Sequence, residues 1–140
     1  MIRVVIDTNV WVAGLLSRTG PPARVVDLSL AGIMVPVVGP HILREYERVL
    51  LHRDLGLSVP DVNAVMAYLK LPGSHVVHVD PIEPLRVCAD PDDDIFIAAA
   101  VEGRAAALIT GNLRHYPTSP WRGIVITSPA VFLKSMSLIE

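Results

Sequence analysis

Short apolar runs alternate with helical patterns along nearly the whole chain, and this alternation restricts the possible folds more than any other feature of the sequence. The first run, 2–6, is rich in β-branched residues and ends abruptly at Asp7. Strands that are apolar on both faces are typical of parallel sheets covered by helices on each side. The sequence therefore predicts an open α/β fold with a parallel sheet.

The same patterns predict the individual elements. Strands are expected at 2–6, 33–38, 75–79, 106–109 and 124–126, and helices at 10–16, 21–31, 41–52, 61–71, 92–102 and 129–136, with an irregular connection over 80–90. Pro36 lies inside the second strand, and proline cannot donate to a sheet ladder. This strand is therefore expected at a sheet edge or with a bulge.

Length and composition limit the class of protein. The 140 residues suit one domain over 1–140, and 51% hydrophobic against 19% charged residues excludes a disordered chain. A net charge of −2 provides no broad basic surface, so a nucleic acid would need a local basic patch. Cys88 is the single cysteine and is expected to be a core residue in a reducing compartment. Without an apolar run of about 20 residues, we expect no membrane span and a cytoplasmic protein.

Polar residues directly follow two of the expected strands. Asp7, Thr8 and Asn9 follow the first, while Thr110, Gly111 and Asn112 follow the fourth. Ligands of open parallel sheets bind beyond the carboxyl ends of the strands. Thr8 and Asn9 can cap the next helix, which leaves Asp7 free for a functional role.

Four acidic residues stand within positions 90–94. Asp90 as N-cap before Pro91, with acids in the first turn, explains one or two of them through the helix dipole. Capping and the helix dipole do not account for all four acids. Asp93 and Asp94 both project toward the body of the protein at helical spacing, so either is a candidate ligand.

The helix at 41–52 carries two further candidates. Glu45 and Glu47 flank its apolar stripe symmetrically, so periodicity does not decide which of them faces the sheet. For each, the simpler interpretation is a solvated side chain paired with an arginine.

Carboxylates brought together in this way would require a cation. Two of them about 5 Å apart repel by roughly 3 kcal/mol at an effective dielectric constant of about 20. An all-carboxylate site suits Mg²⁺ or Mn²⁺. Zinc is disfavoured because His75 and His78 would point to opposite faces of a strand. Carboxylate-held Mg²⁺ acts on phosphate oxygens, so hydrolysis of a nucleic acid is the leading chemical hypothesis.

Four motifs in order carry a family resemblance. They are Val4-Val5-Ile6-Asp7-Thr8-Asn9, Glu45-Tyr46 before Val49-Leu50, Asp90-Pro91-Asp92-Asp93 before Phe96-Ile97, and Ile109-Thr110-Gly111-Asn112. The chain resembles PIN domains, in particular VapC-type toxins of toxin–antitoxin pairs. The resemblance implies a three-layer α/β/α fold with a central parallel sheet, and a metal-dependent endoribonuclease that binds one or two Mg²⁺ or Mn²⁺ ions.

The resemblance also implies roles for particular residues. It favours Asp7, Glu45 and Asp93 as metal ligands, over Glu47 and Asp94. Asn112 stands where a fourth acid often follows, so one tightly held ion is expected, with a second recruited by RNA phosphate. The supporting residues expected around the ligands are Thr8, Asn9, Asp90, Asp94, Thr110 and Asn112.

The expected partners are an RNA substrate, a second copy of the chain in a homodimer, and an antitoxin protein. The candidates for phosphate contact are Arg18, Arg24, Arg44, Arg48, Arg114 and His115. Two other functions remain open: an inactive PIN-like module that binds RNA or protein, and a phosphotransferase with Asp7 as nucleophile. A phosphotransferase of this kind usually has an acid at the position of Asn9 and a lysine at the site. The lysines of the chain are Lys70 and Lys134.

Overall fold

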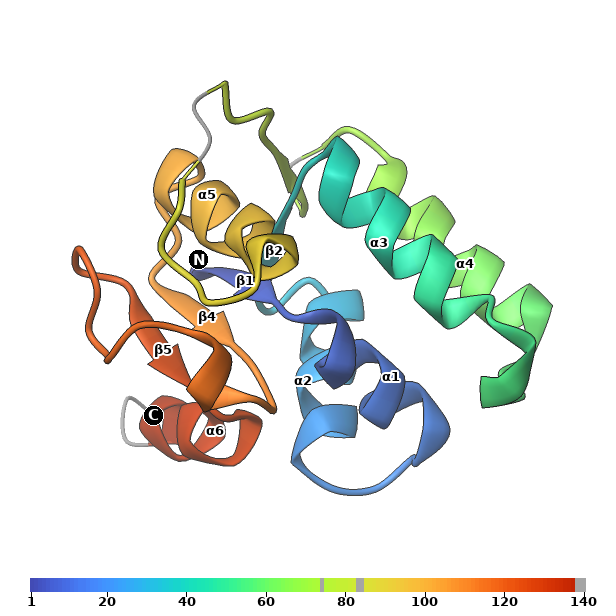
Figure 1. The fold of residues 1–140 in the computed structure, drawn as a ribbon. Helices are drawn as coiled ribbons and strands as arrows, with labels where there is room; N and C mark the ends of the chain where they lie inside the picture. The colour runs from blue at the N-terminus through green and yellow to red at the C-terminus, as the bar shows by residue number, and fades with distance from the viewer. Residues whose placement is uncertain (74, 83–84, 138–140) are drawn as a thin grey trace.

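A five-stranded parallel sheet forms the centre of the protein (Figure 1). The computed structural model describes residues 1–73, 75–82 and 85–137. In spatial order the strands are β3 (Val77–His78), β2 (Val35–Val38), β1 (Arg3–Ile6), β4 (Ala107–Ile109) and β5 (Val125–Thr127). All four pairings are parallel, so the carboxyl ends of the strands meet at one edge of the sheet.

Helices cover both faces of this sheet and complete the predicted three-layer α/β/α fold (Figure 1). In the described residues the α-helices are α1 (Thr8–Leu16), α2 (Pro21–Leu30), α3 (Pro40–Leu50), α4 (Val59–Lys70), α5 (Asp94–Glu102) and α6 (Pro129–Ser137). Short 3₁₀ turns lie at Arg53–Leu55, Pro91–Asp93 and Leu113–His115. No helix of the described chain has the length and apolar character needed to cross a membrane.

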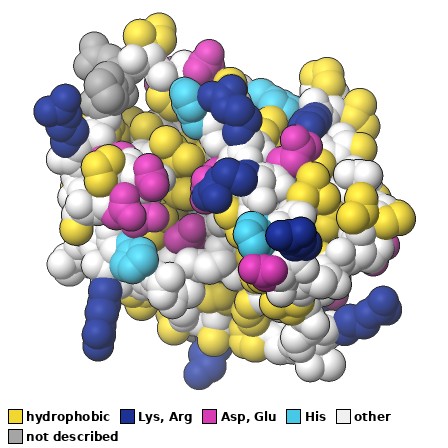
Figure 2. Space-filling model, turned by 45° about the vertical axis from the view of Figure 1, so that its right-hand side comes forward, with side chains coloured by type: hydrophobic (Ala, Val, Ile, Leu, Met, Phe, Trp, Pro, Cys, Tyr) yellow, Lys and Arg dark blue, Asp and Glu magenta, His cyan; other side chains and the backbone are white. Residues whose placement is uncertain are grey.

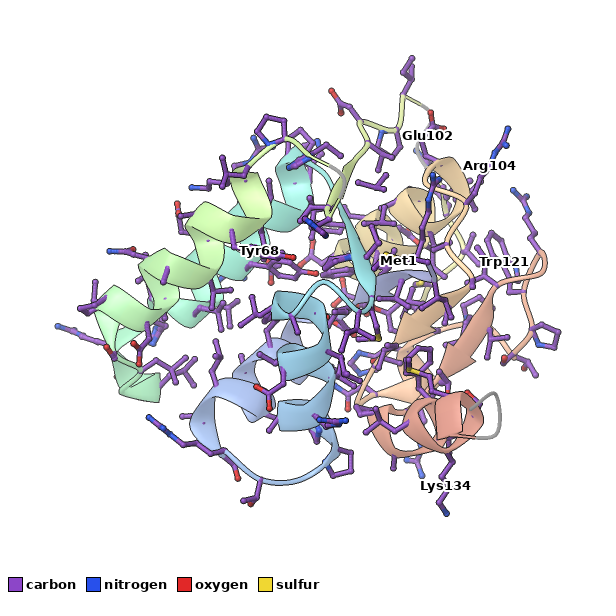
Figure 3. The ribbon with its side chains drawn as sticks, turned by 180° about the vertical axis from the view of Figure 1, so that it is seen from behind. Met1, Tyr68, Glu102, Arg104, Trp121 and Lys134 are labelled. Atoms are coloured by element: carbon purple, nitrogen blue, oxygen red, sulfur yellow. The ribbon has the colours of Figure 1, made fainter. Side chains whose placement is uncertain are left out.

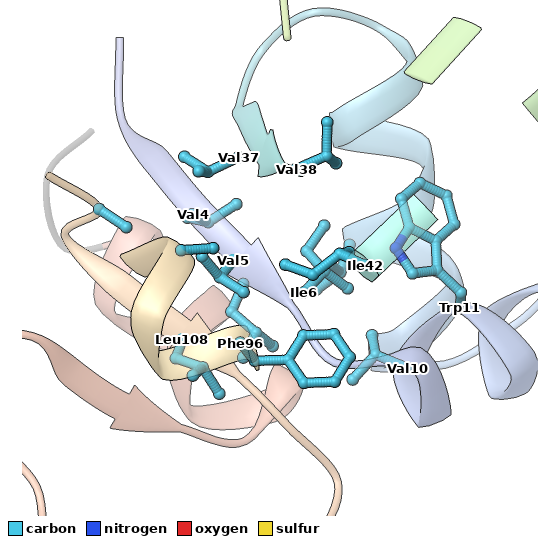
Figure 4. Packing of buried hydrophobic residues seen from close by; sticks show 14 of the residues in the cluster. Val4, Val5, Ile6, Val10, Trp11, Val37, Val38, Ile42, Phe96 and Leu108 are labelled. Atoms are coloured by element: carbon cyan, nitrogen blue, oxygen red, sulfur yellow. The ribbon is translucent and has the colours of Figure 1, made fainter. Parts of the chain in front are cut away.

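The core forms where the apolar strands meet the helices. Val4, Val5 and Leu108 on β1 and β4 are fully buried, with Phe96 of α5 packed beside them (Figure 4). Trp11 of α1 and Tyr46 of α3 are also fully buried, and their rings pack 5.8 Å apart. Figure 3 shows Tyr68 of α4 from the opposite side, where its hydroxyl donates to the Ser29 carbonyl at 3.1 Å. This hydrogen bond joins α4 to α2.

The expectation for Pro36 was wrong, because β2 lies between β1 and β3, and its pairing with β1 runs one to one through Pro36 without a bulge. The amide of Val35 donates toward β1, so the position of Pro36 faces β3. The ladder with β3 begins only at Val37, opposite Val77. Proline is tolerated here because β3 is too short to offer an acceptor at that level.

Several helices and strands also begin or end at other residues than predicted. Thr8 is the first residue of α1 rather than its cap, and Asp7 takes the N-cap position without a side-chain capping hydrogen bond. The helix predicted at 92–102 divides into the Pro91–Asp93 turn and α5. The strand predicted at 75–79 shortens to two residues. The connection over 80–90 is irregular where described, and residues 83–84 of it, like 138–140 of the predicted domain, lie outside the described residues.

Candidate active site

A pocket of about 450 Å³ opens at the carboxyl edge of the sheet. Asp7 follows β1, Asn112 follows β4 by three residues, Glu45 comes from α3 and Asp93 from the turn before α5. The full lining is Asp7, Thr8, Asn9, Val12, Ala13, Leu16, Glu45, Val49, Asp92, Asp93, Phe96, Asn112 and His115. The three acids predicted as ligands therefore line one pocket.

Asp7 is the most enclosed of these acids, only 5% exposed. Its Oδ2 accepts hydrogen bonds from the Thr110 hydroxyl at 2.8 Å, the Tyr116 hydroxyl at 2.9 Å and the Asn9 amide at 3.3 Å. All three donors are neutral. They orient the carboxylate through one oxygen and bring no positive charge to it.

Asp93 contributes a second carboxylate to the pocket. Burial, together with the negative charge of Asp7, raises the pKa of Asp93, while His115 opposes the shift. Its Oδ2 is buried and accepts no hydrogen bond in the described residues, although Nδ1 of His115 lies 3.3 Å away. A buried carboxylate oxygen without a donor is costly unless something positive approaches it.

Asp94 has a different environment and does not line this pocket. Its Oδ1 accepts the backbone amides of Cys88 at 2.8 Å and Val87 at 3.0 Å. Burial tends to raise the pKa of Asp94, but these hydrogen bonds prevail and lower it. Asp94 therefore anchors the 80–90 connection to α5, which makes Asp93 the better candidate ligand of the two. Asp90 caps the intervening turn by accepting the amide of Asp92 at 2.9 Å.

The two glutamates of α3 are also distinguished by their contacts. Glu47 pairs with Lys70 of α4 at 2.8 Å and does not line the pocket. Glu45 does line it, but both of its carboxylate oxygens lie 3.0 Å from Nη2 of Arg48, one turn along the same helix. Glu45 is thus at the pocket and already engaged with a cation of the protein.

Backbone and side-chain hydrogen bonds connect the residues that follow β1 and β4. Asn9 accepts the amide of Gly111 at 2.9 Å, and Thr110 accepts the amide of Asn112 at the same distance. A side chain at Gly111 would bring its Cβ within 3.1 Å of the Asn9 oxygen, so glycine suits this close approach. The supporting roles predicted for Asn9, Thr110 and Asn112 remain predictions, and the structure places all three residues beside Asp7.

Sequence reasoning missed Tyr116 and Tyr46. Tyr116 lies 109 positions from Asp7, and no local pattern indicates that its hydroxyl reaches that carboxylate. Burial raises the pKa of Tyr116, and the charge of Asp7 adds to the effect, so its hydroxyl remains a donor. The Tyr46 hydroxyl donates to the carbonyl of Ile6, directly before Asp7. The only available signal was the position of Tyr46 beside Glu45 in the second motif.

Basic residues lie beside the acidic pocket rather than around its full rim. Figure 2 shows dark blue and cyan side chains close to the magenta ones on this face. Arg44 and Arg48 are exposed on α3, and Nη2 of Arg44 lies 2.7 Å from Nδ1 of His41. Of the other candidates for phosphate contact, His115 lines the pocket, while Arg18, Arg24 and Arg114 do not.

The expected three-carboxylate cluster is not assembled in this conformation. Among the residues that the structure describes, no three His, Cys, Asp or Glu side chains are placed to share an ion. The pocket nevertheless fits Mg²⁺ or Mn²⁺ in its chemistry. It presents hard oxygen ligands, and two of its buried oxygens, Asp93 Oδ2 and Thr8 Oγ1, have no hydrogen-bond partner in the described part of the chain. Glu45 lines the same pocket as Asp7 and Asp93, but its carboxylate is paired with Arg48.

Comparison with known proteins identifies the family of this fold. A family model described as "PIN domain" matches residues 3–114. An uncharacterized protein of Methanocaldococcus jannaschii, MJ1680, is 34% identical over 111 residues, which cover 79% of this chain and 71% of that protein. PIN domains are generally nucleases and typically use divalent metal ions. The matched range contains β1, α3, α5 and β4, and with them Asp7, Glu45 and Asp93. The chain therefore belongs to the PIN domain family.

Proposed function

We propose that this protein is a Mg²⁺- or Mn²⁺-dependent endoribonuclease. The observation that carries the proposal is one pocket at the carboxyl edge of the sheet, where Asp7 and Asp93 are both enclosed and Glu45 stands at the wall. Two carboxylates in one partly buried pocket repel each other, and a divalent cation is the simplest compensation.

Each residue of the pocket would have a distinct role. Asp7 and Asp93 would hold the ion, with Glu45 as the third ligand. When bound, the ion supplies an activated water and neutralises charge on the scissile phosphate. Thr110, Tyr116 and Asn9 would orient the Asp7 carboxylate, since each donates to its Oδ2. Thr8 and Asn112 line the pocket and can hydrogen-bond to ordered water there.

The number of ions follows from the charge of the ligands. Asn112 stands at the pocket wall where an acid would add a further negative charge, and amide oxygens bind divalent cations more weakly than carboxylates do. One tightly held ion is therefore proposed, with a second recruited by the RNA phosphate. Titration of the protein with Mn²⁺ in the absence of RNA should give a stoichiometry near one.

The decisive experiment is cleavage of a mixed panel of single-stranded and structured RNAs with Mg²⁺, Mn²⁺ or EDTA. Wild-type protein should cleave only with a divalent ion, and Asp7→Asn and Asp93→Asn should each lower the rate by at least about 100-fold. Glu47→Gln is the matched control, because Glu47 pairs with Lys70 away from the pocket, and it should cleave normally. Cleavage that persists in EDTA or in the Asp7→Asn variant would rule out this function.

A second candidate function is supported by the pairing of Glu45 with Arg48, which leaves the three acids unassembled. In that case the protein would be an inactive module that binds RNA. Tight RNA binding without cleavage under any divalent ion would establish this alternative.

We further propose that the protein acts as the toxin of a toxin–antitoxin pair and forms a homodimer. Support comes from the resemblance to VapC-type toxins and from exposed apolar residues near the end of α1 and the start of α4. Leu16 and Leu57 line a cavity of about 200 Å³ there, and Val59 beside it is 55% exposed. A monomer at high concentration in light scattering would refute the dimer. A neighbouring reading frame that encodes no small regulator would refute the antitoxin.

A further inference from the structure

The exposed side of α3 carries a row of basic side chains. His41, Arg44 and Arg48 are spaced three and four residues apart, so they share one face of the helix. All three are exposed. Arg44 and Arg48 supply two guanidinium groups on this exposed face, one turn apart, and Glu45 between them lines the acidic pocket. A phosphate backbone is the complementary partner for such a row.

Arg48 connects this row to the pocket. Its Nη2 lies 3.0 Å from each carboxylate oxygen of Glu45, and Glu45 lines the pocket that contains Asp7 and Asp93. Arg44 instead contacts Nδ1 of His41, which must accept because a guanidinium has only donors. Of these two arginines, Arg48 is therefore the one that engages an acid of the pocket.

The ion pair between Arg48 and Glu45 is suited to exchange. The Arg48 side chain is 70% exposed and that of Glu45 is 30% exposed, so water screens the pair and either partner can be replaced at little cost. Arginine binds phosphate at least as well as it binds a carboxylate, through the same N–H donors. A divalent cation and Arg48 require the same oxygens of Glu45.

We propose that Arg48 exchanges its partner from Glu45 to an RNA phosphate, so that binding of RNA along α3 releases Glu45 to the divalent ion. Arg48 is then a positioning residue that couples substrate binding to completion of the ligand set. This inference rests on the proposed function and names the path of its substrate. By linkage, RNA and the ion should each strengthen binding of the other.

The first test measures RNA binding without metal. Fluorescence anisotropy of a labelled 12-nucleotide single-stranded RNA is recorded in EDTA for wild type, Glu45→Gln and Glu47→Gln. Both substitutions remove one negative charge from α3, but only Glu45→Gln frees Arg48. Glu45→Gln should therefore tighten RNA binding about two- to fivefold more than Glu47→Gln, as expected for release of an exposed ion pair.

The same comparison in an Arg48→Ala background separates exchange from general electrostatics. There the advantage of Glu45→Gln over Glu47→Gln should vanish, because no Arg48 remains to be released. An advantage that persists in this background, or equal effects of the two substitutions in the native background, would overturn the exchange.

The second test measures the ion without RNA. Titration with Mn²⁺ should show about two- to fivefold tighter binding for Arg48→Ala, whereas Arg44→Ala, which removes the same charge one turn away, should bind Mn²⁺ as wild type does. Equal affinities for the two variants would refute the competition for Glu45.

Cleavage by the wild-type protein, measured separately, distinguishes the two proposals. If the wild type cleaves RNA but Glu45→Gln and Glu47→Gln bind RNA equally well, the exchange is refuted and the nuclease function stands. Absence of both RNA binding and cleavage would overturn the exchange and the nuclease function together.

Discussion

The hydrogen bond from Tyr116 to Asp7 should be one of the strongest single interactions around the pocket. The hydroxyl lies 2.9 Å from Oδ2, Tyr116 is 8% exposed and Asp7 is 5% exposed, so little water screens the contact. Hydrogen bonds to charged groups contribute about 1.5–3 kcal/mol, against about 0.5–1.5 kcal/mol for neutral pairs. Tyr116→Phe should therefore lower the free energy of unfolding by about 1.5–3 kcal/mol.

Tyr68→Phe provides a matched control. It removes the same atom, but the Tyr68 hydroxyl donates to the neutral carbonyl of Ser29 at 3.1 Å. Its cost should be about 0.5–1.5 kcal/mol. Urea unfolding of wild type and both variants in EDTA at neutral pH, with m-values compared, gives the two differences directly.

The excess cost of Tyr116→Phe over Tyr68→Phe depends on the ionised carboxylate of Asp7. In an Asp7→Asn background the acceptor is neutral, so the excess should disappear. Equal costs for the two tyrosine variants in the native background would refute the conclusion that Tyr116 stabilises a charged Asp7.

Three further predictions follow from neighbouring contacts. Asp94→Ala should lower the free energy of unfolding in urea by about 2–4 kcal/mol, because the amides of Val87 and Cys88 lose their acceptor. These hydrogen bonds lower the pKa of Asp94 in spite of burial. The destabilisation should therefore be largest above the pKa of this carboxyl in the unfolded chain and should decrease as the pH falls. Burial, with Asp94 adding to the effect, raises the pKa of Cys88, so alkylation at pH 8, followed by mass spectrometry, should be more than about tenfold slower than for a free cysteine and should accelerate in urea. Mn²⁺ at 100 times its dissociation constant should stabilise the wild type by about 2.7 kcal/mol in thermal unfolding and leave Asp7→Asn unchanged.

The fold could be predicted from the sequence because its strands are apolar on both faces. In the structure β2 and β4 are buried at every position, which is the pattern that indicated a parallel sheet. Pro36 was misplaced because its tolerance depends on the length of β3, about 40 residues further along the chain. A local pattern carries no information about how far a neighbouring strand extends.

The site could be predicted only in part, for a similar reason. Asp7 stood out because it ends an apolar strand, but the choice between Glu45 and Glu47 was symmetric on α3. The structure separates them through Lys70, a residue of α4 that pairs with Glu47. Likewise, Asp94 is distinguished from Asp93 by two backbone amides of the connection before α5. Each distinction depends on a contact between elements, which periodicity within one helix cannot reveal.

The protein stabilises Asp7 and Glu45 in two different ways. Asp7 is held by three neutral donors, which bring no positive charge to its carboxylate. A lysine or arginine in place of Tyr116 would stabilise the carboxylate as well, but it would cancel the charge that a divalent ion needs. Glu45 has such a cation in Arg48, at an exposed position where water and phosphate can compete for it. Asp7 therefore lies among buried neutral donors, while Glu45 lies at the surface beside an arginine, and under the proposed function the first would be a permanent ligand and the second an exchangeable one.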